Sequence, residues 1–134
     1  MNIDKATSTI QLTQIYLKES IFKRGDSLNA SFSLKINTHT KRDGNKFEVS
    51  VNVVLESKED TFFACSVTTT GLFSINGEFP KDQITFERIN APAIIYPYVR
   101  HHIRNLSIES GLNPILIPIV NFESLYKQDS PPVQ

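Results

Sequence analysis

Regular alternation of apolar and polar residues constrains the fold of this 134-residue chain more than any other feature. In residues 29–36, and again in residues 47–55, every second side chain is apolar. A period of two places the apolar side chains on one face of a β-strand and the polar ones on the other. An Asp43-Gly44 pair lies in the polar turn between these stretches, and Asp-Gly is a strong hairpin signal. We therefore expect an antiparallel hairpin with one buried and one solvated face.

Two further stretches complete the expected sheet. Residues 8–22 also alternate, but the apolar phase changes between Leu12 and Ile15, as a β-bulge would cause. Residues 61–73 are rich in β-branched and aromatic residues, which is typical of a strand. The four stretches together indicate an antiparallel sheet that is wet on one side.

The pattern then changes to a helical one. Asn90 is followed by Ala-Pro, which favours a helix start, and apolar residues recur at helical spacing until Gly111, which favours a helix end. Pro97 lies inside this helix and is expected to kink or delay it. Residues 113–118 are apolar but interrupted by proline, and a short helix is expected over residues 121–126.

These elements predict an α+β fold in which a four-stranded antiparallel sheet is followed by a long and a short helix. The length fits a single domain, which we place at residues 1–127, with a short flexible tail over residues 128–134.

Charge and composition restrict the class of protein. The 14 basic and 14 acidic residues balance, so the chain has no net positive charge that would attract nucleic acid. Residues 1–6 are polar, unlike a signal peptide, and no stretch approaches the ~20 apolar residues of a membrane span, so we expect no membrane insertion. A single cysteine, Cys65, excludes an internal disulfide and fits a reducing compartment. We expect a cytoplasmic protein.

No group of residues indicates catalysis. His101 and His102 are adjacent, so on a helix they point about 100° apart and cannot chelate one metal ion. Cys65 lies in an alternating strand, where a small core residue is a better interpretation than a nucleophile. We therefore expect a protein that is not an enzyme and has neither a cofactor nor a metal ion.

The apolar residues that follow the long helix leave two alternatives open. They complete the core or an oligomer interface, or they line a groove for an extended apolar peptide with the last helix as its lip. The set comprises Ile115, Leu116, Ile117, Phe122, Leu125 and Tyr126.

The long helix has apolar or aromatic residues on more than one side, which is more than one sheet face can cover. We therefore predict a homo-oligomer that buries part of this helix. The predicted interface residues are Ile95, Tyr98, Val99, His102 and Leu106.

Four segments of the chain are distinctive. In chain order they are Ile15-Tyr-Leu-Lys-Glu19, Thr69-Thr-Gly-Leu-Phe-Ser-Ile75, Asn90-Ala-Pro-Ala-Ile-Ile-Tyr-Pro-Tyr-Val-Arg100 and Asn113-Pro-Ile-Leu-Ile-Pro-Ile-Val-Asn-Phe-Glu-Ser-Leu-Tyr126. The most specific strings are Pro-Tyr-x-Arg and the Pro-x-x-x-Phe-x-x-Leu ending. With these segments the chain resembles the SecB family of bacterial protein-export chaperones over residues 8–127, more weakly in the second and third strands.

The resemblance implies a homotetramer, a dimer of dimers joined through the long helices, that holds unfolded polypeptides without ATP and passes them to the motor SecA. It also implies that the second strand, the proline-interrupted segment and the last helix form the walls of a peptide-binding groove. The implied groove residues are Phe32, Leu34, Ile36, Ile115, Ile117, Phe122, Leu125 and Tyr126.

The chain departs from the family at the positions that dock SecA. Glu19 matches an acidic docking position, but Lys23 and Ser66 stand where the family has two further acidic residues, and the tail is brief. Holding of clients is expected to persist, whereas delivery to SecA is expected to weaken. One alternative is a SecB-like chaperone dedicated to a single partner such as an antitoxin. Another is an α+β domain that binds a small ligand in a closed pocket.

Overall fold

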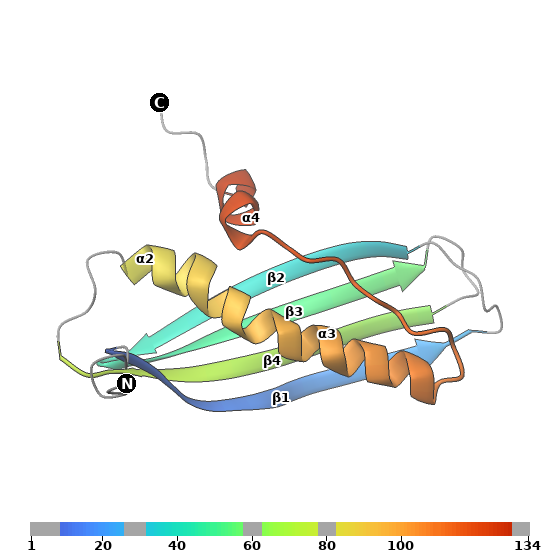
Figure 1. Cartoon of the computed structure of the whole chain (residues 1–134), viewed down its shortest axis with the longest axis horizontal. Coiled ribbons are helices and arrows are strands. Elements are labelled where there is room, and N and C mark those ends of the chain that lie inside the picture. Colours follow the sequence, from blue (N-terminus) through green and yellow to red (C-terminus); the bar gives the residue numbers. More distant parts are fainter. Residues whose placement is uncertain (1–8, 26–31, 58–62, 78–82, 130–134) are drawn as a thin grey trace, which may run out of the picture.

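The computed structural model describes residues 9–25, 32–57, 63–77 and 83–129. Within them the chain forms a four-stranded sheet followed by helices (Figure 1). The elements in chain order are β1 (Ile10–Arg24), β2 (Phe32–Asp43), β3 (Lys46–Ser57), β4 (Phe63–Ile75), the helical turn α2 (Gln83–Thr85), the π-helical turn η1 (Phe86–Asn90), α3 (Ala91–Glu109) and α4 (Phe122–Asp129).

The sheet is antiparallel throughout and has the strand order β1-β4-β3-β2, so β1 and β2 are its edges. Val53 of β3 lies between Ile36 of β2 and Val67 of β4 in this register. Gly44, with φ of 62°, closes the hairpin between β2 and β3, as the Asp-Gly pair predicts. The predicted four-stranded antiparallel sheet is confirmed. Of the predicted strand residues, 8, 29–31 and 61–62 lie outside the described residues.

β1 contains two irregularities rather than the single predicted bulge. Its register against β4 shifts between Leu12 and Gln14 and again between Leu17 and Glu19. Each extra residue returns the following apolar side chains to the face they would otherwise leave. Thr13, the first extra residue, donates a hydrogen bond from its hydroxyl to the carbonyl of Leu72 at 3.1 Å.

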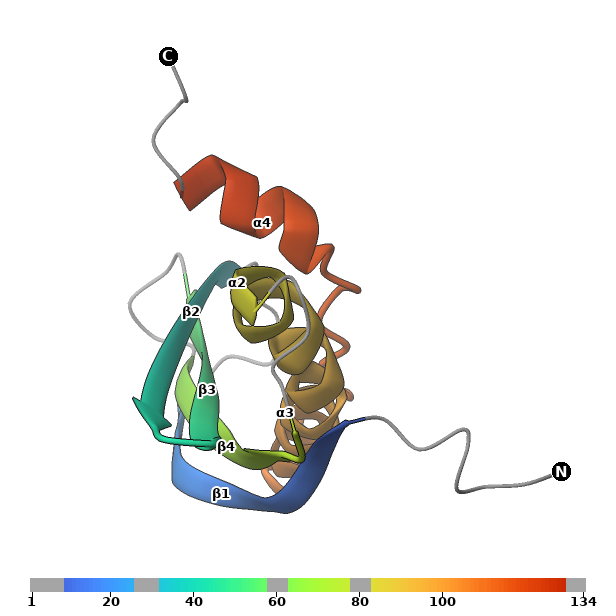
Figure 2. The same ribbon diagram turned by 90° about the vertical axis from the view of Figure 1, so that its left-hand side faces the viewer.

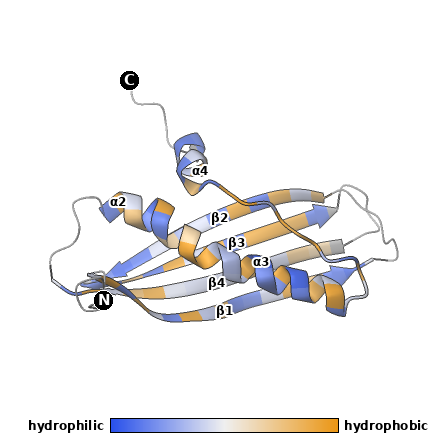
Figure 3. Ribbon diagram, viewed as in Figure 1, coloured by the Kyte–Doolittle hydropathy of each residue, from blue (hydrophilic) through white to orange (hydrophobic). Residues whose placement is uncertain are grey.

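One face of the sheet packs against α3, as Figures 1 and 2 show from two directions. The alternating apolar residues of β3 and β4 that face the helix are almost completely buried, and they pack with one side of α3. Figure 3 shows hydrophobic residues along both β3 and α3, next to hydrophilic ones. The largest buried side chains include Phe73, Leu55, Ile95, Ile103 and Ile117.

The helical region begins earlier than the sequence predicts. The turns α2 and η1 precede α3, so Asn90 already has a helical backbone (φ −73°, ψ −45°) and its side chain makes no capping hydrogen bond. Phe86 anchors the π-helical turn, because its ring packs edge-on against the stacked rings of Phe47 and Phe73. The predicted cap at Asn90 is therefore wrong, and α3 runs through Pro97 without interruption.

The predicted helix end at Gly111 is confirmed. Gly111 has φ of 76°, a conformation that residues with a Cβ rarely adopt. Its N–H donates to the carbonyl of Ile108, and the N–H of Leu112 donates to the carbonyl of Ser107, both at 3.0 Å. Arg24, at the end of β1, donates to the carbonyl of Ser110 at 2.6 Å and places a cation at the negative end of the helix.

α4 extends beyond the predicted short helix and the predicted domain end at residue 127. Asn121 caps it, since its side-chain oxygen accepts the N–H of Ser124 at 3.1 Å. Residues 128 and 129, which we assigned to the flexible tail, are helical, and residues 130–134 lie outside the described residues.

The buried hydroxyl of Ser107 joins α3 to the segment that follows it. This hydroxyl donates to the carbonyl of Arg104 at 2.7 Å and accepts the N–H of Ile115 at 2.9 Å. Ser107 is completely buried, so water cannot replace either bond.

We expect Ser107→Ala to lower the free energy of unfolding by about 1–3 kcal/mol, because the N–H of Ile115 would lose its partner in a buried place. Urea denaturation followed by circular dichroism measures this change. Ser124→Ala, at an exposed position on α4, is the matched control and should change stability by less than about 0.5 kcal/mol. Equal effects of the two substitutions would contradict the assigned role of Ser107.

Candidate polypeptide-binding site

The edge strand β2 carries three apolar side chains that the core covers only in part. Phe32, Leu34 and Ile36 lie on the helix-facing side of the sheet, because Leu34 and Ile36 pair with the buried residues Leu55 and Val53. All three are half-buried and pack against the edge of the core. The period-two pattern therefore identified the correct face of this strand.

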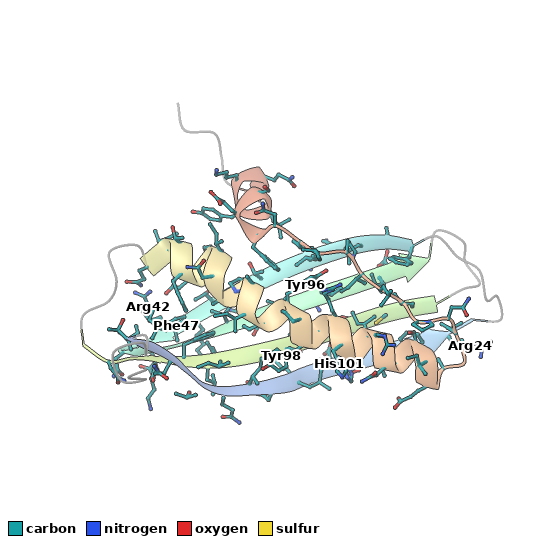
Figure 4. The ribbon with its side chains drawn as sticks, viewed as in Figure 1. Arg24, Arg42, Phe47, Tyr96, Tyr98 and His101 are labelled. Carbon is teal, nitrogen blue, oxygen red and sulfur yellow. The ribbon has the colours of Figure 1, made fainter. Side chains whose placement is uncertain are left out.

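The segment that follows α3 runs back along that helix and is held to it by two side chains. The hydroxyl of Tyr96 donates to the carbonyl of Pro118 at 2.6 Å, and Nε of Arg100 donates to the carbonyl of Ile117 at 3.1 Å. Figure 4 shows Tyr96 on the side of α3 along which this segment passes. Burial raises the pKa of the Tyr96 phenol, and the nearby Arg100 partly offsets that rise, so the phenol keeps its donor proton.

Two predicted groove residues fill the core instead. Ile117 is 1% exposed and Phe122 is 4% exposed. The ring of Phe122 packs edge-on against Tyr96, with ring centroids 5.5 Å apart. These two side chains therefore point into the core and support the site rather than line it. This corrects the prediction for Ile117 and Phe122.

The other predicted groove residues remain available at the surface. α4 packs chiefly against η1, and Figures 1 and 2 both place it at the β2 edge of the molecule. The six half-buried residues of this region form what we call the apolar margin: Phe32, Leu34, Ile36, Ile115, Leu125 and Tyr126. The surface of the same segment also carries Leu116 and Ile119, which are 70% and 85% exposed.

The predicted oligomer interface is only partly accessible. Ile95 and Val99 are completely buried between α3 and the sheet, so they cannot contact a second chain, which corrects the prediction for both. His102 and Leu106 are half-buried, and Nε2 of His102 shares a hydrogen bond of 2.8 Å with the hydroxyl of Ser20 on β1. Tyr98 is 51% exposed and points away from the core.

Sequence reasoning did not include two exposed residues of the same helix in the interface. Ile94 and Ile108 share the face of Tyr98, and their exposed fractions are 42% and 45%. Residues 94, 98, 101, 105 and 108 are spaced alternately by four and three, which is the spacing of a seam between two helices. We call this line of residues the α3 seam, and its spacing was the signal that could have identified it.

The opposite face of the sheet is mainly polar, although Tyr16 and Ile21 of β1 are exposed on it. Asn52 donates to the hydroxyls of Thr68 at 2.9 Å and Ser66 at 3.2 Å, and it accepts from the side chain of Asn37 at 3.1 Å. The side chains at the central positions of this face thus satisfy one another. Glu19 and Lys23 of β1 are exposed on the same face, where they pair in register with Thr68 and Ala64.

The described residues hold no cluster of three or more metal-binding side chains of the His, Cys, Asp and Glu types. Cys65 is buried against the core, and this burial raises its pKa to about 11, so it stays a protonated, unreactive thiol at neutral pH. Within the part of the chain that the structure describes, no helix has the length and apolar character needed to cross a membrane.

Comparisons with known proteins agree with this architecture. The model of the SecB family, described as preprotein translocase subunit SecB, matches residues 4–131. The protein-export protein SecB of Pseudomonas aeruginosa is 31% identical over 94% of this chain and 84% of its own length. That of Alcanivorax borkumensis is 25% identical over 93% of this chain and 88% of its own length.

A solved structure shows the same fold. The Mycobacterium tuberculosis Rv1957 SecB-like chaperone, in complex with a ChAD peptide from the Rv1956 HigA1 antitoxin, superposes with a TM-score of 0.71. The two chains are 18% identical, and the match covers 83% of this chain and 87% of the other. Family model, relatives and fold thus agree, and the chain belongs to the SecB family, whose members are protein-export chaperones and not enzymes.

Proposed function

We propose that this chain holds unfolded preproteins without ATP and keeps them competent for export through the SecA pathway. The observation that carries this proposal is the apolar margin. Its six residues are only half-buried, although the domain already has a large buried core. A half-covered apolar surface of this kind fits an extended, apolar segment of an unfolded chain.

Binding of this kind is promiscuous, because burial of apolar surface has no directional requirement. Complete burial of one Leu side chain contributes about 1.5–3 kcal/mol, and micromolar affinity corresponds to about 8 kcal/mol. Ordering of the client costs free energy as well, so several contacts must form together. An apolar margin of six residues can supply them, whereas two or three exposed side chains would not.

We expect Leu34→Asp combined with Leu125→Asp to abolish the suppression of aggregation of an unfolded client, measured by light scattering without nucleotide. Each carboxylate would have to be desolvated against a bound apolar segment. The matched control is Lys35→Asp with Ser124→Asp, since these exposed residues are neighbours of the altered ones and add the same side chains. The control should suppress aggregation as the unaltered protein does. If this double variant is folded and still suppresses aggregation, the apolar margin is not the surface that binds clients.

The α3 seam supports a homo-oligomer, which we propose to be a tetramer. Ile94, Tyr98 and Ile108 present apolar surface along one line of the helix, and no element of the described chain covers it. Two such seams packed together would remove this surface from water.

Tyr98→Glu should dissociate the assembly, because a single charge within an apolar interface costs several kcal/mol. Light scattering with size-exclusion chromatography at micromolar concentration is the measurement. Ala93→Glu places the same side chain at an exposed position on another side of α3 and should leave the mass unchanged. A mass of 15.2 kDa for the unaltered chain would exclude the tetramer. Val99→Glu is expected to unfold the domain instead, since Val99 is completely buried.

Coupling to SecA is proposed to be weak in this chain. Docking of acidic side chains on a basic partner is steered by charge and weakens as salt rises. Lys23 adds a repulsive charge beside Glu19 on the polar face, and Ser66 contributes none. Each exposed pair is worth only about 0.2–1 kcal/mol, so the combined loss is on the order of tenfold in affinity.

We expect Lys23→Glu with Ser66→Glu to increase the affinity for SecA at low salt, as measured by calorimetry, while holding of clients is unchanged. Lys35→Glu with Ser33→Glu, on the same face but at the β2 edge, is the control for added charge. Tight binding of the unaltered protein with no gain in the double variant would show that these two positions are neutral.

A second candidate function is that of a chaperone dedicated to one partner such as an antitoxin. The specific observation in its favour is the similarity to the mycobacterial SecB-like chaperone, which was solved with an antitoxin peptide. An oligomer that holds clients but does not bind SecA would favour this alternative.

A further inference from the structure

A hollow that neither the apolar margin nor the α3 seam explains lies between α3 and the segment that follows it. Its volume is about 210 Å³. Three basic residues of α3 line one side, and apolar residues complete the wall. We call it the basic hollow, and its residues are Pro97, Arg100, His101, Arg104, Ile115, Leu116 and Ile117.

The positive charge of the basic hollow is not compensated within its walls. Not one carboxylate lines it, and the chain has no charged residue at all from Ser110 to Phe122. Arg100 uses its Nε to bind the carbonyl of Ile117, a neutral acceptor that leaves the charge of the guanidinium intact. Nε2 of His101 accepts a hydrogen bond from the side-chain amide of Asn105 at 3.1 Å, so the fixed positive charge of the hollow comes from Arg100 and Arg104. Arg104 is exposed beside them.

Apolar surface directly adjoins the two arginines. Leu116 contributes to the wall and is 70% exposed. Ile119, two residues past Ile117 on the same uncharged segment, is 85% exposed. A ligand that fits this surface must therefore offer negative charge and apolar side chains together, and a simple inorganic anion would satisfy only half of it.

The basic hollow is also distinct from the α3 seam. At 3.6 residues per turn, Arg104 and Tyr98 lie about 120° apart around the helix axis. Pro97 and Arg100 are on the side of Arg104, next to the segment, and His101 alone belongs to both surfaces. Occupation of the seam by a second chain therefore leaves Arg100 and Arg104 beside the uncharged segment.

We propose that the basic hollow makes this chaperone select unfolded segments in which acidic residues accompany apolar ones, over segments with basic residues. This inference rests on the proposed holding of unfolded polypeptides and adds the class of client. The carboxylates of such a segment would lie against Arg100 and Arg104, and its apolar side chains would cover Leu116 and Ile119.

Charge complementarity at exposed positions gives a modest but measurable selectivity. Two pairs of opposite charge at low salt correspond to a preference of about tenfold, because each exposed pair contributes little. The preference must decrease as salt is added, since the Debye length falls to about 8 Å at 0.15 M and 3 Å at 1 M.

Two fluorescein-labelled peptides test this proposal. They share the same apolar residues, and one has Glu at every polar position where the other has Lys. Fluorescence anisotropy with the full chain should give about tenfold tighter binding of the Glu peptide at low salt. Arg104→Glu should reduce this preference to about twofold or less. Arg88→Glu is the matched control, since Arg88 is exposed on η1 and does not line the basic hollow.

The outcomes separate this inference from the proposed function. Equal binding of both peptides, or equal loss of preference in the Arg104 and Arg88 variants, would overturn the selectivity while holding itself stands. If neither peptide binds and an unfolded client does not bind, both the selectivity and the proposed holding function are wrong. If Arg104→Glu alters the oligomer mass, Arg104→Gln replaces it, and this uncharged variant must still reduce the preference by at least twofold.

Discussion

The close approach of α3 to the sheet at Gly71 sets the position of this helix and, through it, of the segment and the helix that follow. A Cβ at this buried position would lie 3.1 Å from Cδ1 of Ile95 and 3.1 Å from Cε2 of Phe73. A glycine on β4 therefore allows the helix to sit low over the central strands. The segment after α3 is bonded to the helix through Tyr96, Arg100 and Ser107, so its position, and that of α4, follows from this contact.

Because a single helix covers four strands, the apolar residues of the two edge strands are only half-covered. The helix with its side chains is about 10 Å wide, whereas four strands spaced by ~4.8 Å extend about 14 Å from the first to the last. β3 and β4 are covered and their helix-facing residues are buried, but the edges are not. Leu34 and Ile36 on β2, and Leu12 and Leu17 on β1, are half-buried or exposed for this reason. Half-covered apolar surface at the edges of the sheet is thus a geometric consequence of the fold.

Elements set by local chemistry could be predicted from the sequence, whereas those set by packing could not. Alternation predicts the sheet, and Gly111 predicts the end of α3, because both depend on neighbouring residues alone. Helical spacing shows that Val99 and Tyr98 occupy different sides of a helix, but it does not say which side the sheet covers. Ile117 is buried in a segment that Arg100 holds against α3, a contact between residues 17 positions apart that no local pattern encodes.

The two faces of the sheet differ in what they can recognise. On the polar face the amide of Asn52 is already bonded to Asn37, Ser66 and Thr68, so the hydrogen-bonding groups around it are already paired. At the β1 edge of this face, Tyr16 and Ile21 are exposed together with the charges of Glu19 and Lys23. Charges recognise a folded partner of complementary sign. The apolar margin lies on the helix-bearing side, so under the proposed function a client there and a partner on the opposite face would not compete for the same surface.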